Sequence, residues 1–364
     1  MKAKNLVKIG IVAFITLLLF GIQSFSLIEP SNTFAGYNTV KPYMPFEPVN
    51  PNTTEEAREL LKYLYSIKGE KILSGQHNYS SGPRASTDSV IAITGKTPAM
   101  WGGDLVGYFY PEKPRTCRQD IIDEAIKQHN NGSIITIMYH QVKPFDHDSL
   151  GFHKSVKGRV SDLEWQKIIT PGTEYNNMLI EKLDTVAEYL KQLQEKKIPV
   201  LWRPYHEMNG MWFWYGDREG LDGYVNLWKI VYDRYVNHHK LDNLIWVWNP
   251  NAPRNKENDE AYDYKQYYPG NEYVDILATD IYGEYKQSHH DQLLELGKGK
   301  LIAIGECGKL PTPEKLAQMN QFVWFMDWAN MLWRSNKRED VKRLYHDERV
   351  ITLDEHKVLY SNQN

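Results

Sequence analysis

The chain has 364 residues and a formal net charge of −3, and 41% of its residues are hydrophobic. This length allows one large domain or two small ones, and the hydrophobic content allows a sizeable core. Because the charges nearly balance, no basic field attracts nucleic acid, and we expect none as a partner. The 11 Trp and 24 Tyr are many for one domain, and a surplus of flat rings is what a sugar-binding cleft needs.

The first residues are typical of a secretory leader. Lysines precede an almost wholly apolar run at 9–22, which is short for a membrane span. Small residues follow, and cleavage after Ala35 or after Ser26 fits the pattern. We expect residues 1–35 to be a signal peptide and the protein to be extracellular. An uncleaved N-terminal membrane anchor is the alternative.

The two cysteines, Cys117 and Cys307, are too few for a disulfide scaffold, and the sequence leaves open whether they pair. No CxxC motif occurs, so a cysteine zinc site has no support. Residues 36–53 are rich in Pro, Asn and Tyr, and we expect a linker or a strap there. The catalytic domain is then expected at 54–364, beginning with a capped helix that ends near Gly69.

Short apolar runs then alternate with helical patterns. The apolar runs lie at 71–77, 97–105, 133–140, 198–207, 243–249, 274–282, 300–306 and 322–328. The clearest helical patterns lie at 118–130, 174–196, 221–239 and 291–298. Strands that alternate with helices indicate parallel β/α units, and runs that are apolar throughout fit strands buried on both faces.

Eight such units predict an α/β fold, a single-domain (β/α)8 TIM barrel. A doubly wound open sheet is the alternative. Polar and aromatic residues gather at the C-terminal ends of the runs, where barrels of this kind carry their chemistry. These residues are His77, Asp104, His140, Arg203, His206, Glu207, Asn249, Tyr282, Glu306 and Trp328.

The most informative stretch is WRPYHEMNGMWFWYG at 202–216. A carboxyl group among aromatic rings, such as Glu207, loses hydration, which raises its pKa as a general acid requires. The structural alternative is an ion pair between Glu207 and Arg203. A zinc site of the zincin type fails on spacing, because a second His must follow His206 by four residues and position 210 is Gly.

The second stretch is LIAIGECGK at 301–309, in which Glu306 ends the seventh run. Two carboxyl groups from different strands of one barrel can converge across a cleft. At a separation of about 5–5.5 Å, one can attack the anomeric carbon of a sugar while the other protonates the leaving group. Glu306 and Glu207 are the candidates for this pair.

The stretch at 202–216 resembles the signature of glycoside hydrolase family 26, whose best-known members are β-mannanases. The resemblance extends from about Leu73 to about Trp333 and includes SGQHN, WGGDL, LIWVWNPN and the strand of Glu306. It implies a retaining mechanism with Glu207 as acid/base and Glu306 as nucleophile. The residues that it implies in substrate binding are His140, Arg203, His206, Trp212, Tyr282 and Trp328.

The resemblance also implies individual roles. Tyr282 would donate a hydrogen bond to the nucleophile, and Trp212 and Trp328 would be aromatic platforms for sugar rings. In some members the Trp that matches Trp328 precedes a substrate-binding Arg, but Ala329 follows here. That contact is therefore absent or supplied elsewhere. Outside the resemblance, we expect Trp246 and Trp248 to pack in the core, and Asp104 and Asp280 either to orient loops or to contact substrate.

We therefore expect a secreted retaining endo-β-glycosidase, first of all a mannan endo-1,4-β-mannosidase acting on mannan, glucomannan or galactomannan. The alternatives are action on mixed-linkage β-glucan or β-1,3-xylan, release of mannobiose from chain ends, or a barrel that binds carbohydrate without cutting it. We expect no metal or organic cofactor, a β-linked polysaccharide as partner, and a monomer without membrane attachment after signal cleavage. The segment 141–173 is a candidate for the loop that closes one end of the cleft.

Overall fold

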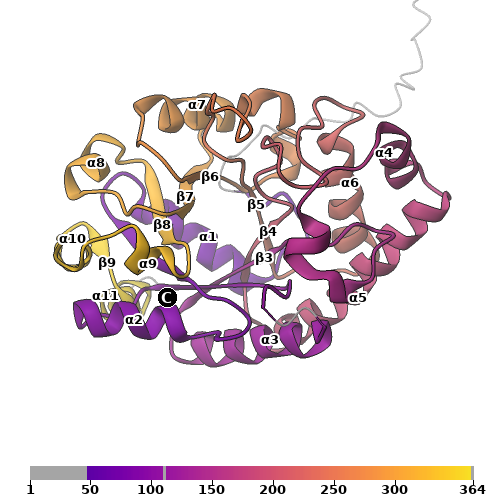
Figure 1. Ribbon diagram of the computed structural model, residues 1–364. Helices are drawn as coiled ribbons and strands as arrows, with labels where there is room; N and C mark the ends of the chain where they lie inside the picture. Colours follow the sequence, from indigo (N-terminus) through magenta and orange to yellow (C-terminus); the bar gives the residue numbers. More distant parts are fainter. Residues whose placement is uncertain (1–46, 110–111, 362–364) are drawn as a thin grey trace, which may run out of the picture. The chain divides into compact units, whose positions relative to one another are not determined.

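The computed structural model describes residues 47–109 and 112–361, so the expected signal peptide and residues 36–46 of the expected linker lie outside the described residues. Eight parallel strands surround a common axis, and helices lie outside them (Figure 1). The strand order is β2-β3-β4-β5-β6-β7-β8-β1, and a β1–β2 pairing closes the ring. The predicted (β/α)8 barrel is confirmed.

The eight barrel strands coincide with the eight apolar runs to within three residues at each end. Every residue in them is buried, which explains why the runs are apolar throughout. The strands are β1 (Ile72–His77), β2 (Met100–Asp104), β3 (Ile134–Tyr139), β4 (Val200–Pro204), β5 (Leu244–Trp248), β6 (Ile276–Ile281), β7 (Leu301–Cys307), β8 (Phe322–Asp327) and the short β9 (Val350–Ile351), which pairs with β1.

The helical patterns at 118–130, 174–196 and 291–298 appear as helices. The pattern at 221–239 starts later than expected, at Tyr224, and ends in a π-helical turn, Arg234–His238. The helices are α1 (Glu55–Ile67), α2 (Ala85–Thr94), α3 (Pro114–Asn130), α4 (Asp162–Ile169), α5 (Glu174–Glu195), α6 (Tyr224–Asp233), α7 (Gln287–Gly297), α8 (Pro313–Gln318), α9 (Met331–Arg334), α10 (Arg338–Tyr345) and α11 (Leu353–Ser361). A second π-helical turn lies at Phe152–Val156, and 3-10 turns lie at Asp148–Leu150, Tyr264–Tyr267 and Asn271–Tyr273.

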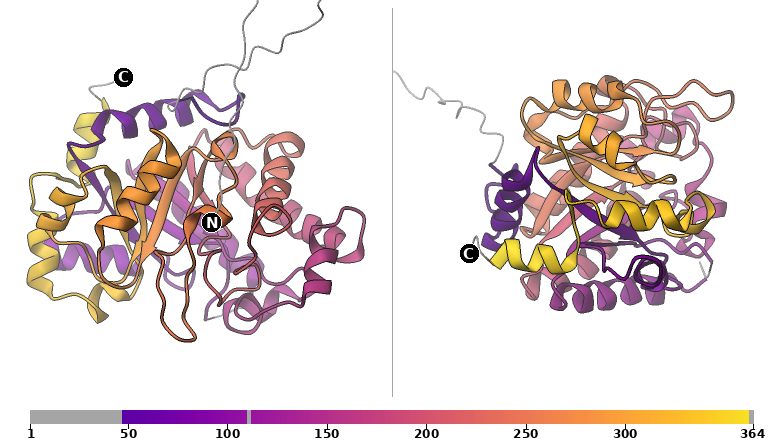
Figure 2. Two further views of the ribbon diagram at one scale, coloured as in Figure 1. Left: turned by 90° about the horizontal axis from the view of Figure 1, so that it is seen from above. Right: turned by 90° about the vertical axis from the view of Figure 1, so that its left-hand side faces the viewer.

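Helix α1 closes the N-terminal end of the barrel. Its buried leucines, including Leu60 and Leu64, join one hydrophobic cluster with residues near the starts of the strands, such as Leu201 and Ile276. Figure 2 shows α1, in indigo, lying across one end of the strands. The described part of the expected linker is held nearby, because the Val49 amide donates to the Asp275 carboxylate at 2.7 Å. The opposite, C-terminal end of the barrel is left for chemistry.

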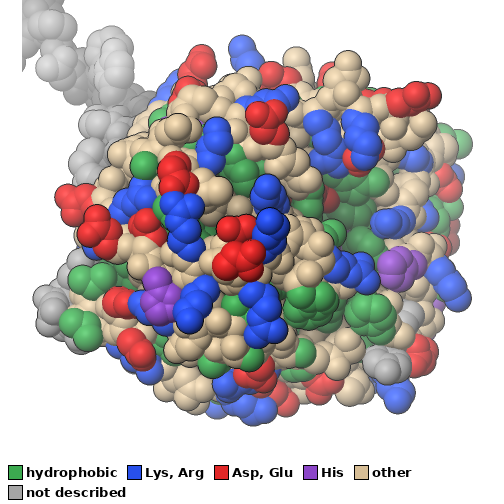
Figure 3. Space-filling model, turned by 60° about the vertical axis from the view of Figure 1, so that its left-hand side comes forward, with side chains coloured by type: hydrophobic (Ala, Val, Ile, Leu, Met, Phe, Trp, Pro, Cys, Tyr) green, Lys and Arg blue, Asp and Glu red, His purple; other side chains and the backbone are tan. Residues whose placement is uncertain are grey.

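The described residues bear on three expectations from the sequence: the balance of charge, the absence of a second membrane-spanning run, and the state of the two cysteines. Acidic and basic side chains are interspersed over the face drawn in Figure 3, as the nearly balanced charge implies. Among the helices in the described residues, none combines the length and the apolar character that crossing a membrane requires. Cys117 and Cys307 are both buried, and no disulfide joins them.

Strand β7 is irregular just before its end. Its pairing with β6 shifts register between Thr279 and Asp280, and its pairing with β8 shifts between Ile304 and Cys307. Irregularities of this kind change the direction of a side chain and recur beside active sites. Gly305 lies within this segment, and a Cβ built on it would lie 1.7 Å from Asn249 Oδ1. No side chain fits at this position.

We expect Gly305→Ala to lower the free energy of unfolding by about 1–3 kcal/mol, because the added methyl group displaces Asn249 from a packed interior. Differential scanning calorimetry measures this as a lower Tm. Gly283→Ala is the matched control, since a Cβ at Gly283 has nothing within 4 Å. Equal Tm values for the two variants would contradict the packing argument.

Candidate active site

The C-terminal ends of the strands bring the predicted site residues together around one cleft of about 730 Å³, a volume typical of ligand sites. Arg203 is buried below the cleft and bonded to Glu306. The other predicted residues line the cleft itself, namely His140, His206, Glu207, Trp212, Tyr282, Glu306 and Trp328.

Glu207 follows β4 in an unusual backbone conformation. Its φ is 55°, and that of Tyr205 is 49°, so both lie in the left-handed region, which costs a non-glycine residue about 1–2 kcal/mol. The Glu207 amide donates to the carbonyl oxygen of Asn249 at 2.7 Å, which holds the turn in place. Backbone strain of this kind gathers at functional sites. It turns the carboxyl group of Glu207 into the cleft.

The carboxyl group of Glu207 is buried and receives two hydrogen bonds. Asn251 Nδ2 donates to Oε1 at 2.5 Å, and Trp212 Nε1 donates to Oε2 at 2.8 Å. Burial, followed by the negative charge of Glu306, raises the pKa of Glu207 to about 7, although both hydrogen bonds act in the opposite direction. A carboxyl group with this pKa holds a proton near neutral pH and can donate it, as a general acid must.

Glu306 has the opposite environment. Arg203 Nη2 donates to its Oε1 at 2.8 Å, and the hydroxyl of Tyr282 donates to its Oε2 at 2.5 Å. Burial, the largest single influence, raises the pKa of Glu306, but the charge of Arg203 and the contacts with His206 together outweigh burial and hold this pKa well below its usual range. Glu306 is therefore ionised at neutral pH. A protonated and an ionised carboxyl group in one cleft are the arrangement of an acid and a nucleophile.

Asp280 and His206 lie beside the Arg203–Glu306 ion pair, but both are uncharged near neutral pH, so the charge of Arg203 acts mainly on Glu306. Burial and the Glu306 charge raise the pKa of Asp280 well above its usual range, so this carboxyl group is neutral although it lies 3.5 Å from Arg203. Burial and the nearby His140 lower the pKa of His206 to about 3. His206 is therefore neutral near pH 7, and its Nε2, 3.3 Å from Glu306, contributes a hydrogen bond rather than a charge.

We expect Arg203→Met to move the acidic limb of the kcat/KM profile to higher pH. Without the guanidinium the pKa of Glu306 rises, so Glu306 becomes protonated, and activity is lost, at a higher pH as the pH falls. Removing one partner of a buried ion pair also costs about 3–5 kcal/mol of stability, so the profile is measured well below the Tm of the variant.

The control for Arg203→Met is Arg118→Met. Arg118 is also buried and pairs with Asp148 at 2.6 Å, but neither residue lines the cleft. We expect Arg118→Met to be destabilised without a change in the acidic limb. An unchanged acidic limb in Arg203→Met would show that Arg203 does not set the pKa of Glu306.

His140 is oriented by residues behind it. Asp104 Oδ2 accepts hydrogen bonds from His140 Nδ1 at 2.6 Å and from the hydroxyl of Tyr108 at 2.7 Å. Burial opposes ionisation of Asp104, but His140 and Tyr108 keep its pKa below the usual value. Since Asp104 is an acceptor, Nδ1 of His140 carries the proton and Nε2 is free to face the substrate. The sequence left the role of Asp104 open, and it positions His140.

Aromatic rings form two sides of the cleft. On one side Trp328 packs against His77 and Tyr79, with ring centroids 4.8 and 5.7 Å apart. On the other, Trp212 has the guanidinium of Arg254 4.8 Å above its ring. Trp246 and Trp248 are fully buried in the hydrophobic core, as predicted.

The sequence analysis missed Tyr108, Asn251 and Arg254. Asn251 belongs to the WNPN segment that follows the fifth strand, so its position was the available signal. Asn251 follows β5 and Glu207 follows β4, so their contact joins two segments far apart in the sequence, and a local sequence pattern cannot predict it.

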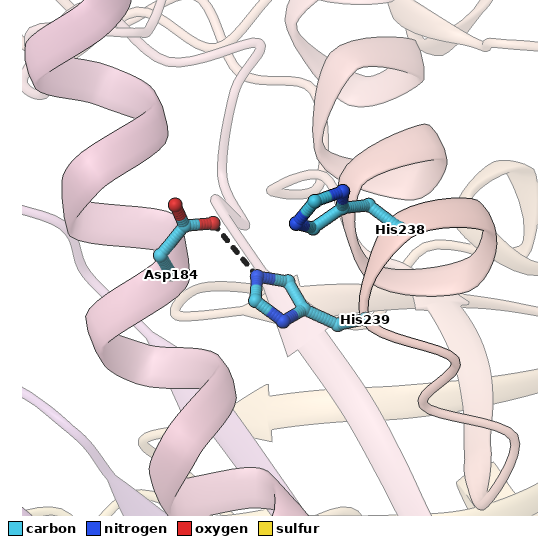
Figure 4. A group of neighbouring side chains, drawn as sticks. All are labelled: Asp184, His238 and His239. Carbon is cyan, nitrogen blue, oxygen red and sulfur yellow. Dashed lines mark hydrogen bonds and ion pairs between the residues drawn. The ribbon is translucent and has the colours of Figure 1, made fainter.

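A group outside the cleft has the side chains of a metal site. Asp184, His238 and His239 lie together (Figure 4), with ligand atoms within 4.8 Å of one another. However, Arg234 donates to both oxygens of Asp184 at 2.6 and 2.7 Å, and His239 Nε2 lies 2.7 Å from the same carboxylate. A guanidinium already satisfies this carboxylate, so the group is an ion-pair cluster that ties α5 to the π-helical turn after α6.

Comparison with known proteins agrees with this geometry. Residues 49–355 match the family Glycosyl hydrolase family 26. A mannan endo-1,4-β-mannosidase from Thermothelomyces thermophilus is 35% identical over 320 residues, which cover 84% of this chain and 62% of that protein. This chain thus spans less than two thirds of that relative's length.

Solved structures show the same similarity. The structure of GH26A from Muricauda sp. MAR_2010_75 superposes with a TM-score of 0.81 and 48% identity, and covers 84% of this chain and 99% of that one. A β-mannanase from a symbiotic protist of the termite Reticulitermes speratus, complexed with gluco-manno-oligosaccharide, has a TM-score of 0.73 and 27% identity, and covers 85% and 97%. The chain belongs to glycosyl hydrolase family 26.

Proposed function

We propose that the protein is a retaining endo-β-1,4-mannanase that hydrolyses mannan, glucomannan or galactomannan. The observation that carries the proposal is that two carboxyl groups line one cleft in opposite surroundings, which raise the pKa of Glu207 to about 7 and hold the pKa of Glu306 well below its usual range. The similarity to a mannan endo-1,4-β-mannosidase and to a mannanase bound to gluco-manno-oligosaccharide supports the choice of substrate.

The residues divide the reaction into two displacements. Glu306 attacks the anomeric carbon while Glu207 gives its proton to the glycosidic oxygen, and a covalent glycosyl-enzyme forms. Glu207, now ionised, takes a proton from water, which attacks the same carbon and releases Glu306 as a carboxylate. Arg203 and Tyr282 aim Glu306 through their hydrogen bonds. Two inversions at one carbon give retained configuration.

Internal cleavage is supported by the extent of the cleft. Trp212 is bonded to Glu207, whereas Trp328 follows β8 next to the strand of Glu306. Aromatic surfaces on both sides of the carboxyl pair provide for sugar units on both sides of the bond that breaks. The presence of both carboxyl groups argues against a barrel that only binds carbohydrate.

The test combines a polysaccharide panel with product analysis. Purified residues 36–364 are incubated with linear mannan, galactomannan, glucomannan, mixed-linkage β-glucan and β-1,3-xylan. We expect release of mixed oligosaccharides from the mannans, with the β-anomer appearing first in ¹H NMR. An initial α-anomer would contradict the retaining mechanism. Mannobiose as the sole early product would contradict endo-action, and cleavage of glucan or xylan alone would change the substrate.

We further propose that residues 1–35 direct export and that the mature enzyme acts outside the cell as a monomer. Support for export comes from the lysines and the apolar run at 9–22. N-terminal sequencing of protein from culture medium tests the first point, and light scattering after gel filtration tests the second. A protein that remains in the membrane fraction, or a dimeric mass, would contradict the respective expectation.

A further inference from the structure

Two basic side chains at the edge of the cleft have no role in the proposed chemistry. Lys157 follows the π-helical turn Phe152–Val156, and Arg334 ends α9. Both are exposed and both line the cleft. Among the described residues, no carboxylate oxygen lies within salt-bridge distance of either side chain, and the Lys157 ammonium lies 5.7 Å over the ring of Phe152.

The other charges of the cleft are compensated. Arg254 pairs with Asp259 at 2.6 Å, and Glu306 pairs with Arg203 at 2.8 Å. Lys157 and Arg334 therefore give the edge of the cleft a positive charge, although the whole chain carries −3. On the face drawn in Figure 3, basic side chains border a hollow lined by hydrophobic ones. A cleft lined by one sign of charge concentrates ligands of the opposite sign.

The two cations flank a continuous aromatic surface. Phe152, below Lys157, packs against Tyr108 with ring centroids 4.5 Å apart, and Tyr108 lies 6.0 Å from Trp328. Beyond Trp328, the hydroxyl of Tyr79 donates to Asn330 at 3.4 Å. Burial raises the pKa of Tyr79 and the charge of Arg334 acts against it, so the guanidinium lies within electrostatic reach of that ring. Both cations therefore lie beside rings that a bound sugar can stack on.

We propose that, among β-mannans, the enzyme prefers those whose sugar units carry carboxylate or sulfate groups, because these groups pair with Lys157 and Arg334. This inference rests on the proposed glycosidase function and specifies its substrate class. Arg334 offers a planar fork that fits either anion with two hydrogen bonds, whereas Lys157 offers a point charge. Neutral mannan stacks on the same rings but leaves both cations without an anion.

The test compares three linear mannans of matched length, which are neutral, partly oxidised to carboxylates at C6, or partly sulfated. kcat/KM is measured at about 10 mM and about 1 M salt, where the Debye length is about 30 Å and about 3 Å. One exposed ion pair is worth up to roughly fivefold in affinity. We therefore expect about a tenfold preference for one or both acidic polymers at low salt, and its loss at high salt.

The variants assign the preference to residues. In the double variant Lys157→Gln/Arg334→Gln, kcat/KM on the acidic polymers should fall to its value on neutral mannan, so that the ratio of the two becomes about one. The control Lys62→Gln/Lys191→Gln removes the same charge from an exposed lysine on α1 and a half-buried lysine on α5, both far along the chain from the cleft residues, and should leave that ratio unchanged. The proposal is overturned if wild type cuts neutral and acidic polymers equally, or if the cleft double variant retains the preference. The acidic polymer with the larger kcat/KM shows whether carboxylate or sulfate is the natural group.

Failure of the proposed function gives a different result. If no polymer is cut, the glycosidase assignment fails. A binding measurement can still show whether Lys157 and Arg334 attract acidic polymers. Isothermal titration calorimetry on Glu207→Gln, with the same three polymers at both salt concentrations, provides that readout. Tighter binding of an acidic polymer at low salt supports the charge argument, and equal affinities overturn it.

Discussion

Glu306→Ala is expected to lower kcat on linear mannan by about four orders of magnitude or more, as loss of a covalent nucleophile does elsewhere. The carboxylate of Glu306 forms the bond to the anomeric carbon, and none of its neighbours can replace it. Asp280 is neutral, His206 is buried and bonded to the carboxylate that has been removed, and Arg203 is a cation. Reducing-sugar release under saturating substrate measures the loss.

Rescue by a small nucleophile separates this role from a structural one. The space left by the carboxylate admits azide, which attacks the anomeric carbon from the same side and gives a glycosyl azide of inverted configuration. We expect azide to restore activity of Glu306→Ala on a substrate with a good leaving group. Glu314→Ala, at an exposed glutamate on α8, is the control and should behave as wild type. Activity of Glu306→Ala within tenfold of wild type would remove Glu306 from the mechanism.

The barrel and the carboxyl pair could be predicted because their signals are local. Strands buried on both faces must be apolar, so eight short runs mark eight strands, and a carboxyl group among aromatic residues at a strand end marks an acid. The contacts of Arg203 were not predictable in this way. The sequence offered an ion pair between Arg203 and Glu207, four residues apart, but Arg203 bonds to Glu306 on another strand. The left-handed backbone at Glu207 turns its carboxyl group to Asn251 and Trp212 instead.

Short elements were missed for a related reason. Helices such as α2, α4, α8 and α10 have ten residues or fewer, too few for a helical period to stand out from the flanking loops. Tertiary packing, rather than their own sequence pattern, stabilises such helices. The register shifts lie around Gly305, where Asn249, just after β5, and Asp280 on β6 leave no room for a side chain. This irregular segment carries Glu306, so the direction of the nucleophile could not be read from its own strand.

Glu207→Ala is expected to lower kcat/KM on mannan by about 10²–10⁴-fold, the usual contribution of a general acid. A dinitrophenyl β-mannoside needs almost no protonation of its leaving group, so the first displacement should be nearly restored on that substrate. The second displacement still lacks its base, so the glycosyl-enzyme accumulates and a burst of dinitrophenol is expected in stopped-flow traces. Equal losses on mannan and on the aryl mannoside, without a burst, would show that Glu207 is not the acid.

The pH dependence gives an independent test of the same residue. Glu207 must be protonated to act, and its pKa is about 7, so kcat/KM of wild type should fall as the pH rises through about 7. This alkaline limb should vanish in Glu207→Ala. In Asn251→Ala the pKa should rise, because the hydrogen bond from Asn251 is one of the contacts that lower it, and the limb should move to higher pH. Asn251 reaches Glu207 from the segment after β5, so a shift in that direction would tie the protonation of the acid to a contact between segments that follow two different strands. An unchanged limb would mean that the hydrogen bond from Asn251 does not set the pKa of Glu207.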